Sequence, residues 1–290
     1  MSEQRIAVIT DTGTDTPEAF VAAHDVRVVP LRINYSDGST FESGVDITPE
    51  QLVGRFAEEV PSTSLPSPLR IQETFEGARR DGYDGAVFVA ISSGLSATYE
   101  TVSMVARQME ADGFPVVVVD TKSIGVAAGL VVMEAVRQVE AGMPLSSLGS
   151  VLEGVARRTR VFFSVQSLDF LHKGGRIGDA EYHLGSVLRI KPVFTCDEAG
   201  KYVVAKKARG WKRALDEEVR LAVEAARAHD RVRLAICSYE DEGIFERLEE
   251  QLRREVGAVS EVVEVLRSGI SADLLVHTGP SLAGVAVMGC

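Results

Sequence analysis

The sequence predicts an α/β protein of two domains, an N-terminal parallel α/β/α sandwich over residues 1–160 and a C-terminal mixed-sheet α/β domain over residues 161–290. The chain has 290 residues, and a single hydrophobic core stops growing at about 250 to 300 residues. In the first half, short apolar runs alternate with longer amphipathic stretches, as expected for buried parallel strands covered by helices. Beyond Val161 the predicted strands alternate apolar and polar residues instead, which indicates a mixed sheet.

The apolar runs of the first half place its strands. They are expected at residues 6–10, 26–33, 86–92 and 115–120. A helix is expected to begin after Thr48, because Pro49 suits the first turn and Gln51 completes a capping box. Ser67 before Pro68 marks a second helix start by the same pair of cap and proline.

The second domain is expected to contain a β-hairpin near its start. Residues 194–197 and 201–208 alternate between the two faces of a strand and flank an Asp-Glu-Ala-Gly turn. Amphipathic stretches then predict helices, and further apolar runs predict strands. The helices are expected at residues 211–228 and 243–256, and the strands at residues 232–238, 260–266 and 284–288.

Composition argues against several classes of protein. Apolar residues make up 45% of the chain and charged residues 25%, which is the balance of an ordered globular protein. The net charge of −11 disfavours binding to nucleic acid and to anionic membranes. No segment has the pattern of a signal peptide or of a membrane span, so we expect a cytoplasmic protein.

Cysteines and histidines give no sign of a metal site. The three cysteines, Cys196, Cys237 and Cys290, are odd in number and widely spaced, which fits a reducing compartment better than disulfides or zinc ligands. The five histidines include no metal-binding pair such as H-E-x-x-H. We therefore expect neither a metal nor a cofactor.

A serine-rich loop is the first candidate binding feature. Residues 91–100, ISSGLSATYE, follow a predicted strand and precede a predicted helix. Open α/β sheets bind ligands at the carboxyl ends of their strands, and the N-terminus of a following helix favours an anion. Ser93 and Ser96 add hydroxyl donors, and Gly94 permits close approach to the backbone. The alternative is a serine N-cap with no ligand.

A second polar segment, residues 61–68 with the sequence PSTSLPSP, is predicted to be a turn between two helices. Thr63 and Ser64 can offer hydroxyl groups to an anion from a turn that its prolines stiffen. The alternative is ordinary turn chemistry. Asp11 and Asp120 end two further predicted strands, and we expect them to cap helices and orient loops rather than contact a ligand.

Two motifs of the second half carry basic or titratable side chains. Residues 171–178, LHKGGRIG, place Lys173 and Arg176 beside paired glycines, whose N–H groups can face a phosphate. This run is not a P-loop, and the chain contains neither a P-loop nor a G-x-G-x-x-G fingerprint. His277 begins the run HTGPS, where a lone histidine also has an ordinary structural explanation.

Taken in order, these motifs resemble those of the DegV family of bacterial fatty-acid-binding proteins. The matching segments are TSLPS, SSGLSATY, DTKS, KGGRI, KP followed by a K-x-R near Lys207, and HTGP. The resemblance implies that the two domains enclose one long-chain fatty acid, of the C14 to C18 class, with its carboxylate between them. It also implies that a separate dihydroxyacetone-kinase-like kinase phosphorylates the carboxylate to an acyl phosphate. The chain itself is then expected to present the lipid and not to be an enzyme.

The resemblance implies which residues bind the head group. Thr63 matches the threonine that binds the carboxylate, with Ser64 beside it. Either Ser93 or Ser96 matches the serine, and Gly94 lies between them. Which of the two serines is the main ligand stays open.

The resemblance also implies that His277 lies beside the head group and that Arg176 and Arg209 face the kinase. The sequence departs from the family pattern at Leu65, where glutamine is usual, at Ala97, where glycine is usual, and at Ser281, where the second glycine of G-P-G is usual. The hydroxyl groups survive all three changes. The preferred length and saturation of the acyl chain are not encoded in any motif.

Two other functions are consistent with parts of the sequence. A serine-dependent ester hydrolase would use Ser93 or Ser96 as nucleophile and His277 as base, although the loop lacks G-x-S-x-G. A self-sufficient kinase is disfavoured because the chain has no P-loop. We expect a monomer, because the partner that the resemblance implies is a different protein.

Overall fold

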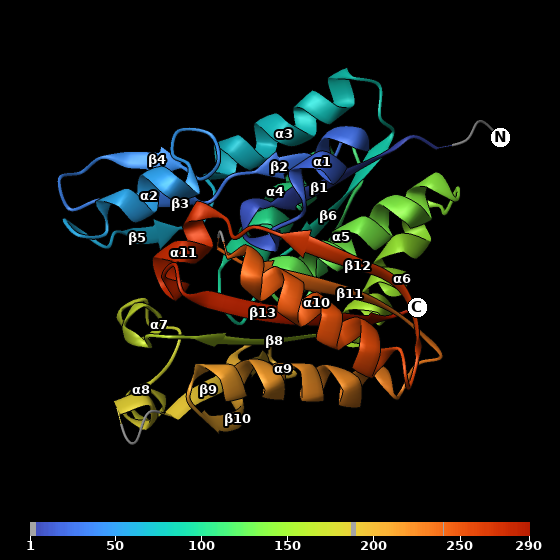
Figure 1. The fold of residues 1–290 in the computed structure, drawn as a ribbon. Helices are drawn as coiled ribbons and strands as arrows, with labels where there is room; N and C mark the ends of the chain where they lie inside the picture. Colours follow the sequence, from blue (N-terminus) through green and yellow to red (C-terminus); the bar gives the residue numbers. More distant parts are fainter. Residues whose placement is uncertain (1–3, 187–189, 240) are drawn as a thin grey trace.

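Two main sheets, with a smaller sheet beside the first, make up the structure, a computed structural model that describes residues 4–186, 190–239 and 241–290 (Figure 1). The first main sheet has four strands and the second has six. The first is parallel and the second is mixed. The predicted two-domain α/β fold is therefore confirmed.

The N-terminal domain is the predicted α/β/α sandwich. Its main elements are β1 (Ile6–Asp11), η1 (Thr12–Thr14), α1 (Glu18–Ala23), β2 (Arg27–Val29), α3 (Pro68–Arg80), β6 (Gly85–Ala90), α4 (Thr98–Ala111), β7 (Val116–Asp120), α5 (Gly125–Glu140) and α6 (Leu145–Arg157). The strand order is β2-β1-β6-β7. Helices α3 and α4 cover one face, and α5 and α6 cover the other, which explains why the strands are apolar on both faces.

A three-stranded antiparallel sheet corrects two predictions. Its segment contains β3 (Arg32–Asn34), β4 (Thr40–Glu42), α2 (Pro49–Arg55) and β5 (Ser62–Ser64). The single strand predicted over residues 26–33 is wrong, because Pro30 has no N–H for a strand ladder and the chain changes sheets there. The turn predicted over residues 61–68 is also wrong, since β5 pairs with β3 and sets Thr63 opposite Ile33.

Both predicted helix caps are confirmed. The Gln51 N–H donates to the Thr48 hydroxyl over 3.3 Å, and the Thr48 N–H donates to the Gln51 side chain over 2.9 Å, which completes the capping box of α2. The Arg70 N–H donates to the Ser67 hydroxyl at the start of α3. These caps fix the two helices on either side of β5.

The C-terminal sheet has the strand order β10-β9-β8-β13-β11-β12. The elements of this half are β8 (Thr159–Val165), α7 (Asp169–Lys173), α8 (Asp179–Ser186), β9 (Ile190–Cys196), β10 (Tyr202–Arg209), α9 (Trp211–Ala226), β11 (Arg231–Ser238), α10 (Glu242–Val256), β12 (Glu261–Ser268), α11 (Ala272–Thr278) and β13 (Leu282–Gly289). Strands β9 and β10 form the predicted antiparallel hairpin. Helices α9 and α10 pack on one face over a core of their own.

Helix α5 lies against both main sheets. Twelve consecutive residues, from Gly125 to Val136, are buried. One apolar cluster contains this helix together with strand residues of the parallel sheet and of the mixed sheet. At its C-terminal end, Arg137 pairs with Glu264 of β12 over 2.8 Å. The two domains therefore share one continuous core.

Two absences hold for the described parts of the chain. Over residues 4–186, 190–239 and 241–290, no helix combines the length and apolarity needed to cross a bilayer. Nor do three or more acidic, histidine or cysteine side chains gather there as ligands for a metal ion.

Candidate ligand-binding site

A cavity of about 360 Å³ lies where the three-stranded sheet, the loop after β6, α11 and the segment after α7 meet. Much of its wall is apolar, with Leu31, Ile91 and Leu274 among the lining residues. Its polar lining includes Thr63, Ser64, Ser96, Arg176, Asp273 and His277. An apolar cavity with a few convergent polar groups is the usual form of a small-molecule site.

Thr63 and His277 form the central polar pair of the cavity, although they are 214 residues apart in the sequence. The Thr63 hydroxyl lies 2.7 Å from Nε2 of His277. Antiparallel pairing of β5 with β3 holds Thr63, and α11 holds His277. Burial lowers the pKa of His277 to about 3, and the nearby positive charge of Arg176 acts in the same direction. The imidazole is therefore neutral at physiological pH.

The position of Gly174 determines how this imidazole is seated. A Cβ atom at Gly174 would lie 2.2 Å from Nδ1 of His277, so only glycine leaves room for the ring. Nδ1 is buried and has no hydrogen-bond partner. A buried N–H group without a hydrogen-bond partner is rarer in proteins than a buried acceptor atom without one. We therefore infer that the proton of the neutral imidazole is on Nε2 and that Nδ1 is the unpaired acceptor. Nε2–H then donates to the Thr63 oxygen and leaves the Thr63 hydroxyl proton free to donate into the cavity.

Arg176 lines the cavity, whereas the resemblance implied that it faces the kinase. Its side chain is half-buried, and burial lowers its pKa. The guanidinium donates to the carbonyl oxygens of Gly174 and Leu95. These two bonds turn the side chain inward, because both carbonyls belong to segments around the cavity. Arg209, in contrast, is exposed at the end of β10 and does not line the cavity.

Ser64 and Ser96 also lie at the cavity wall. The Asn34 side chain donates to the Ser64 hydroxyl over 3.1 Å. The Ser96 hydroxyl accepts from the Thr98 N–H at the start of α4 and lies 2.8 Å from the Thr98 hydroxyl. Ser96 thus lines the cavity and also holds the chain that enters α4, whose N-cap is Ala97.

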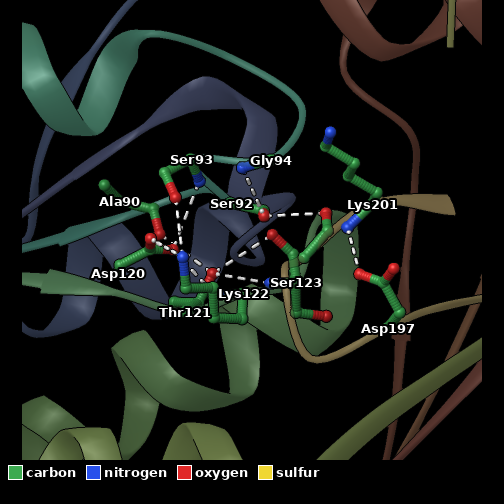
Figure 2. Close-up of polar contacts among 11 residues, drawn as sticks. Ala90, Ser92, Ser93, Gly94, Asp120, Thr121, Lys122, Ser123, Asp197 and Lys201 are labelled. Carbon is green, nitrogen blue, oxygen red and sulfur yellow. Dashed lines mark hydrogen bonds and ion pairs between the residues drawn. The ribbon is translucent and has the colours of Figure 1, made fainter.

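Ser93 and Gly94 are not among the residues that line the cavity. Figure 2 shows Ser93 beside Lys122, whose ammonium group donates to the Ser93 hydroxyl over 2.8 Å and also pairs with Asp120 over 2.8 Å. Gly94 packs against the β9–β10 turn, where a Cβ would lie 2.5 Å from the Ala199 carbonyl oxygen. The structure therefore brings Thr63, Ser64, Ser96, Arg176 and His277 together and leaves Ser93 and Gly94 outside.

Asp11 and Asp120 have the structural roles that the sequence predicted. Asp11 accepts from the N–H groups of Gly13 and Ile91 and caps η1. Asp120 accepts from the N–H groups of Ser93 and Lys122. Both carboxyl groups orient the loops that follow the parallel strands.

The comparison with known families decides the family of the chain. The model of the DegV family, whose description is "uncharacterised protein", matches residues 5–289. The chain belongs to the DegV family. A DegV domain-containing protein of Deinococcus radiodurans is 31% identical over an alignment of 303 positions, gaps included. The alignment covers 97% of this chain and 98% of that protein. Another, of Clostridium acetobutylicum, is 29% identical over 286 residues, which cover 98% and 99%.

A solved DegV family structure from Thermus thermophilus, described as fatty acid binding, has the same fold. It superposes with a TM-score of 0.88 at 31% sequence identity, over 99% of this chain and 100% of that one. The resemblance to the DegV family that the motifs indicated is thereby confirmed.

Asp273 is an acidic cavity residue of this DegV chain that the sequence did not predict, as are the polar lining residues Tyr202 and Thr278. It lies one helical turn before His277 on α11 and lines the same cavity. The available signal was a single acidic residue inside the otherwise apolar run ADLLV. Such a residue in a buried helix needs a partner or a function.

An ester hydrolase would need a hydrogen bond between a nucleophilic serine and His277, and within the described residues neither Ser93 nor Ser96 forms one. Within the described residues, the only side-chain partner of His277 is Thr63, and the Ser96 hydroxyl bonds at Thr98. Ser93 is held by Lys122, which is itself paired with a carboxylate. A nucleophilic serine needs a base within hydrogen-bond reach, and neither serine has one here.

Proposed function

We propose that this chain binds one long-chain fatty acid in the cavity and presents its carboxylate to a separate dihydroxyacetone-kinase-like kinase. The observation that carries the proposal is the hydrogen-bonded pair of Thr63 and His277, at the wall of a largely apolar cavity that Arg176 also lines. The ligand class is supported by the Thermus thermophilus relative, whose structure is described as fatty acid binding.

The head group is assigned to Thr63, Ser64 and Ser96. With Nε2–H of His277 donating to the Thr63 oxygen, the Thr63 hydroxyl has one proton to donate to a carboxylate. A hydrogen bond to an ionised acceptor is about twice as strong as a neutral one. Of the two candidate serines we assign Ser96, because it lines the cavity and Ser93 does not.

Arg176 supplies the countercharge in this proposal. A guanidinium has five N–H donors, and two carbonyl oxygens accept from Arg176. A half-buried cation is costly without an anion nearby. A bound carboxylate would compensate that cost, so Arg176 is expected to contribute to ligand affinity in addition to any role toward a partner.

The acyl chain supplies most of the binding free energy. Burial gains about 0.8 kcal/mol per methylene, on the order of 10 kcal/mol for a C16 chain before the costs of association. Leucine and isoleucine side chains around the polar pair suit such a chain. The head group mainly fixes orientation, because its hydrogen bonds replace bonds to water.

Presentation to a kinase is assigned to the exposed cation Arg209. The chain carries a net charge of −11, so an exposed arginine such as Arg209, at the end of β10, can steer a phosphate-bearing partner. The phosphoryl transfer itself belongs to that partner. This chain then acts as a lipid-binding subunit, in the cytoplasm and as a monomer.

The ligand is tested by native mass spectrometry of the purified protein with and without added palmitate. One palmitate per chain is expected. Thr63→Val should weaken binding by about 1.5 to 3 kcal/mol, or roughly 10- to 150-fold, because a buried carboxylate loses a charge-assisted donor. Ser62→Val, at the exposed neighbour on the same strand, is the matched control and should change little. A wild-type protein that takes up no fatty acid would refute the proposal.

The two arginines are separated by measuring binding and turnover on the same samples. Arg209→Ala should keep palmitate and lower acyl-phosphate formation when the kinase, ATP and magnesium are supplied. Arg176→Ala should weaken palmitate binding itself, and acyl-phosphate formation should fall as a consequence. Arg213→Ala, an exposed cation at the start of α9, is the control for Arg209. Normal phosphorylation with Arg209→Ala would remove it from the docking surface.

A further inference from the structure

Asp273 has a position that packing alone does not explain. Its carboxyl group is buried and lines the cavity, although its side chain is the least suited to an apolar wall. Asp273 and His277 are four residues apart on α11, so their side chains lie on the same face of the helix. The acid therefore lies next to the polar pair to which we assign the head group.

The two oxygens of Asp273 have different surroundings. Oδ1 accepts from the Ser43 hydroxyl over 2.6 Å, and the Ser43 oxygen in turn accepts from the Asp273 N–H over 3.2 Å. Oδ2 is buried and has no hydrogen-bond partner. The contact with Ser43 accounts for Oδ1 as a structural link between α11 and the segment before α2. It leaves Oδ2 unexplained.

Two more buried carboxyl groups, those of Asp11 and Asp15, lie near Asp273. The Ser271 N–H donates to Asp15 over 2.9 Å at the start of α11, and the Ile91 N–H donates to Asp11 over 3.0 Å. Burial raises the pKa of both Asp11 and Asp15, and the charge of Asp273 opposes the ionisation of both as well. No ion pair to a cation relieves any of the three within the described residues.

Ionisation of Asp273 would place a negative charge in this setting with only neutral donors to stabilise it. Burial raises the pKa of Asp273, opposed by the hydroxyl groups of Ser43 and Thr12. A neutral carboxyl group has the reverse requirement, because its O–H needs an acceptor. Since Ser43 already donates to Oδ1, the proton belongs on Oδ2, and its acceptor is either a neighbouring hydroxyl group, of Thr12 or Ser271, or a group in the cavity that Asp273 lines.

We propose that Asp273 determines ligand specificity as a neutral acid, whose Oδ2–H donates a hydrogen bond to the carboxylate of the bound ligand. The inference rests on the proposed function, since the acceptor is the head group of the fatty acid. The acid and the carboxylate then share one negative charge, which Arg176 faces from the cavity wall. A carboxylate is favoured over an uncharged ester, because an ionised acceptor forms the stronger bond.

Two substitutions at this position separate a donor from a charge. Asp273→Asn keeps an acceptor for Ser43 and supplies an amide N–H to the ligand, so dodecanoate affinity should stay within about threefold. Asp273→Leu removes the donor and should weaken dodecanoate binding at least tenfold, with little effect on methyl dodecanoate. If Asp273→Asn instead bound dodecanoate tenfold more tightly, the acid would be ionised and repelling, and the inference would be wrong.

A pH series distinguishes this role from a purely structural one. Above about pH 6 the dodecanoate carboxyl is ionised, and wild-type affinity should fall with rising pH as Asp273 loses its proton. The other titratable or charged groups facing it are Asp11, Asp15, His277 and Arg176. Asp273→Asn should abolish most of the fall. Ser43→Ala should shift it to higher pH, because the ionised form loses a hydrogen bond.

Infrared difference spectra provide a readout that needs no ligand. A carbonyl band of a protonated carboxyl group, present in the wild type at pH 7 and absent in Asp273→Asn, is expected. Its absence from the wild type would overturn the inference while leaving fatty acid binding intact. Failure of the wild type to bind either dodecanoate or palmitate would overturn the proposed function, and the specificity role of Asp273 with it.

Discussion

Carboxyl groups are buried in two regions of the molecule, and their surroundings differ. Around the cavity, Asp11, Asp15 and Asp273 each accept a hydrogen bond from a backbone N–H or a hydroxyl group. Between the mixed sheet and α9, Glu218 is fully buried, and neither of its oxygens has a partner. The Ser164 hydroxyl on the adjacent strand also lacks a hydrogen bond of good geometry, although it is near enough to lower the pKa of Glu218.

This contrast teaches that burial alone does not show what a polar group contributes. The cavity acids hold loops in place, so their removal leaves donors unpaired. Glu218 accepts no hydrogen bond of good geometry, so burying it costs free energy. We therefore expect the first group to be needed for the native structure and Glu218 to be replaceable with a gain.

The largest expected effect is that of pH on stability. Burial raises the pKa of Asp11 from 3.8 to about 8, and burial also raises the pKa of Glu218. Each folded-state carboxyl keeps a proton that the unfolded chain loses, so the stability that these two groups contribute is fully present below about pH 4 and is lost as the pH rises toward 8. Each such group contributes at most about 1.4 kcal/mol per pH unit. His277, whose pKa is lowered to about 3, opposes this trend below pH 6.5.

Urea unfolding at pH 5 and at pH 8 measures this effect. The free energy of unfolding should be lower at pH 8, and the difference should shrink in Asp11→Asn and in Glu218→Gln. A protein that is more stable at pH 8 than at pH 5 would mean that these carboxyl groups ionise in the folded state.

Next in size is the loss of Asp11. Asp11→Ala leaves the N–H groups of Gly13 and Ile91 without their acceptor and should destabilise the protein by about 3 kcal/mol at pH 5. Asp11→Asn keeps one acceptor oxygen and should cost about half as much. Equal costs for the two variants in urea unfolding would show that only one of the two bonds matters.

Glu218→Met should act in the opposite direction and stabilise the protein by about 1 to 3 kcal/mol at pH 7, since a group of similar volume replaces an unpaired acid. Glu224→Met, at an exposed position of the same helix, is the matched control and should change stability by less than about 0.5 kcal/mol. Destabilisation by Glu218→Met in thermal unfolding would indicate that Glu218 has a partner and belongs with the cavity acids.

The smallest effect is expected at the ion pair of the exposed Lys122 with Asp120, whose side chain is largely buried. Lys122→Ala removes that ion pair and the bond to Ser93, and should cost at most about 1 kcal/mol, because the ammonium group of the pair is in contact with water. Palmitate affinity should be unchanged, since Ser93 is outside the cavity. A loss of palmitate affinity in Lys122→Ala, measured by isothermal titration calorimetry, would mean that Ser93 belongs to the site that binds the head group.

Local sequence signals predicted much of this fold. The parallel strands, the hairpin and the caps at Thr48 and Ser67 follow from patterns within a few residues. The break at Pro30 was legible in principle, because proline cannot continue a strand ladder. The partner sheet that receives the chain after Pro30 was not, since it depends on pairing with β5, about 30 residues away.

The site was only partly predictable for the same reason. Thr63, Ser96 and His277 lie in motifs that the sequence displays. Choosing Ser96 over Ser93 depends on the path of the loop, which Lys122 and the β9–β10 turn determine. The position of the Asp273 carboxyl group depends on its hydrogen bond with Ser43, which is 230 residues away in the sequence. Contacts at such separations have no local pattern.

Helix α5 limits how a ligand can enter and leave. It belongs to the first domain by connectivity, yet its buried residues pack against strands of both main sheets. Two rigid lobes that swung apart would expose this helix to water along its length. Exchange is therefore expected to proceed by local opening of small elements at the cavity, such as α11 and its neighbours β5 and α7, while the shared core stays closed.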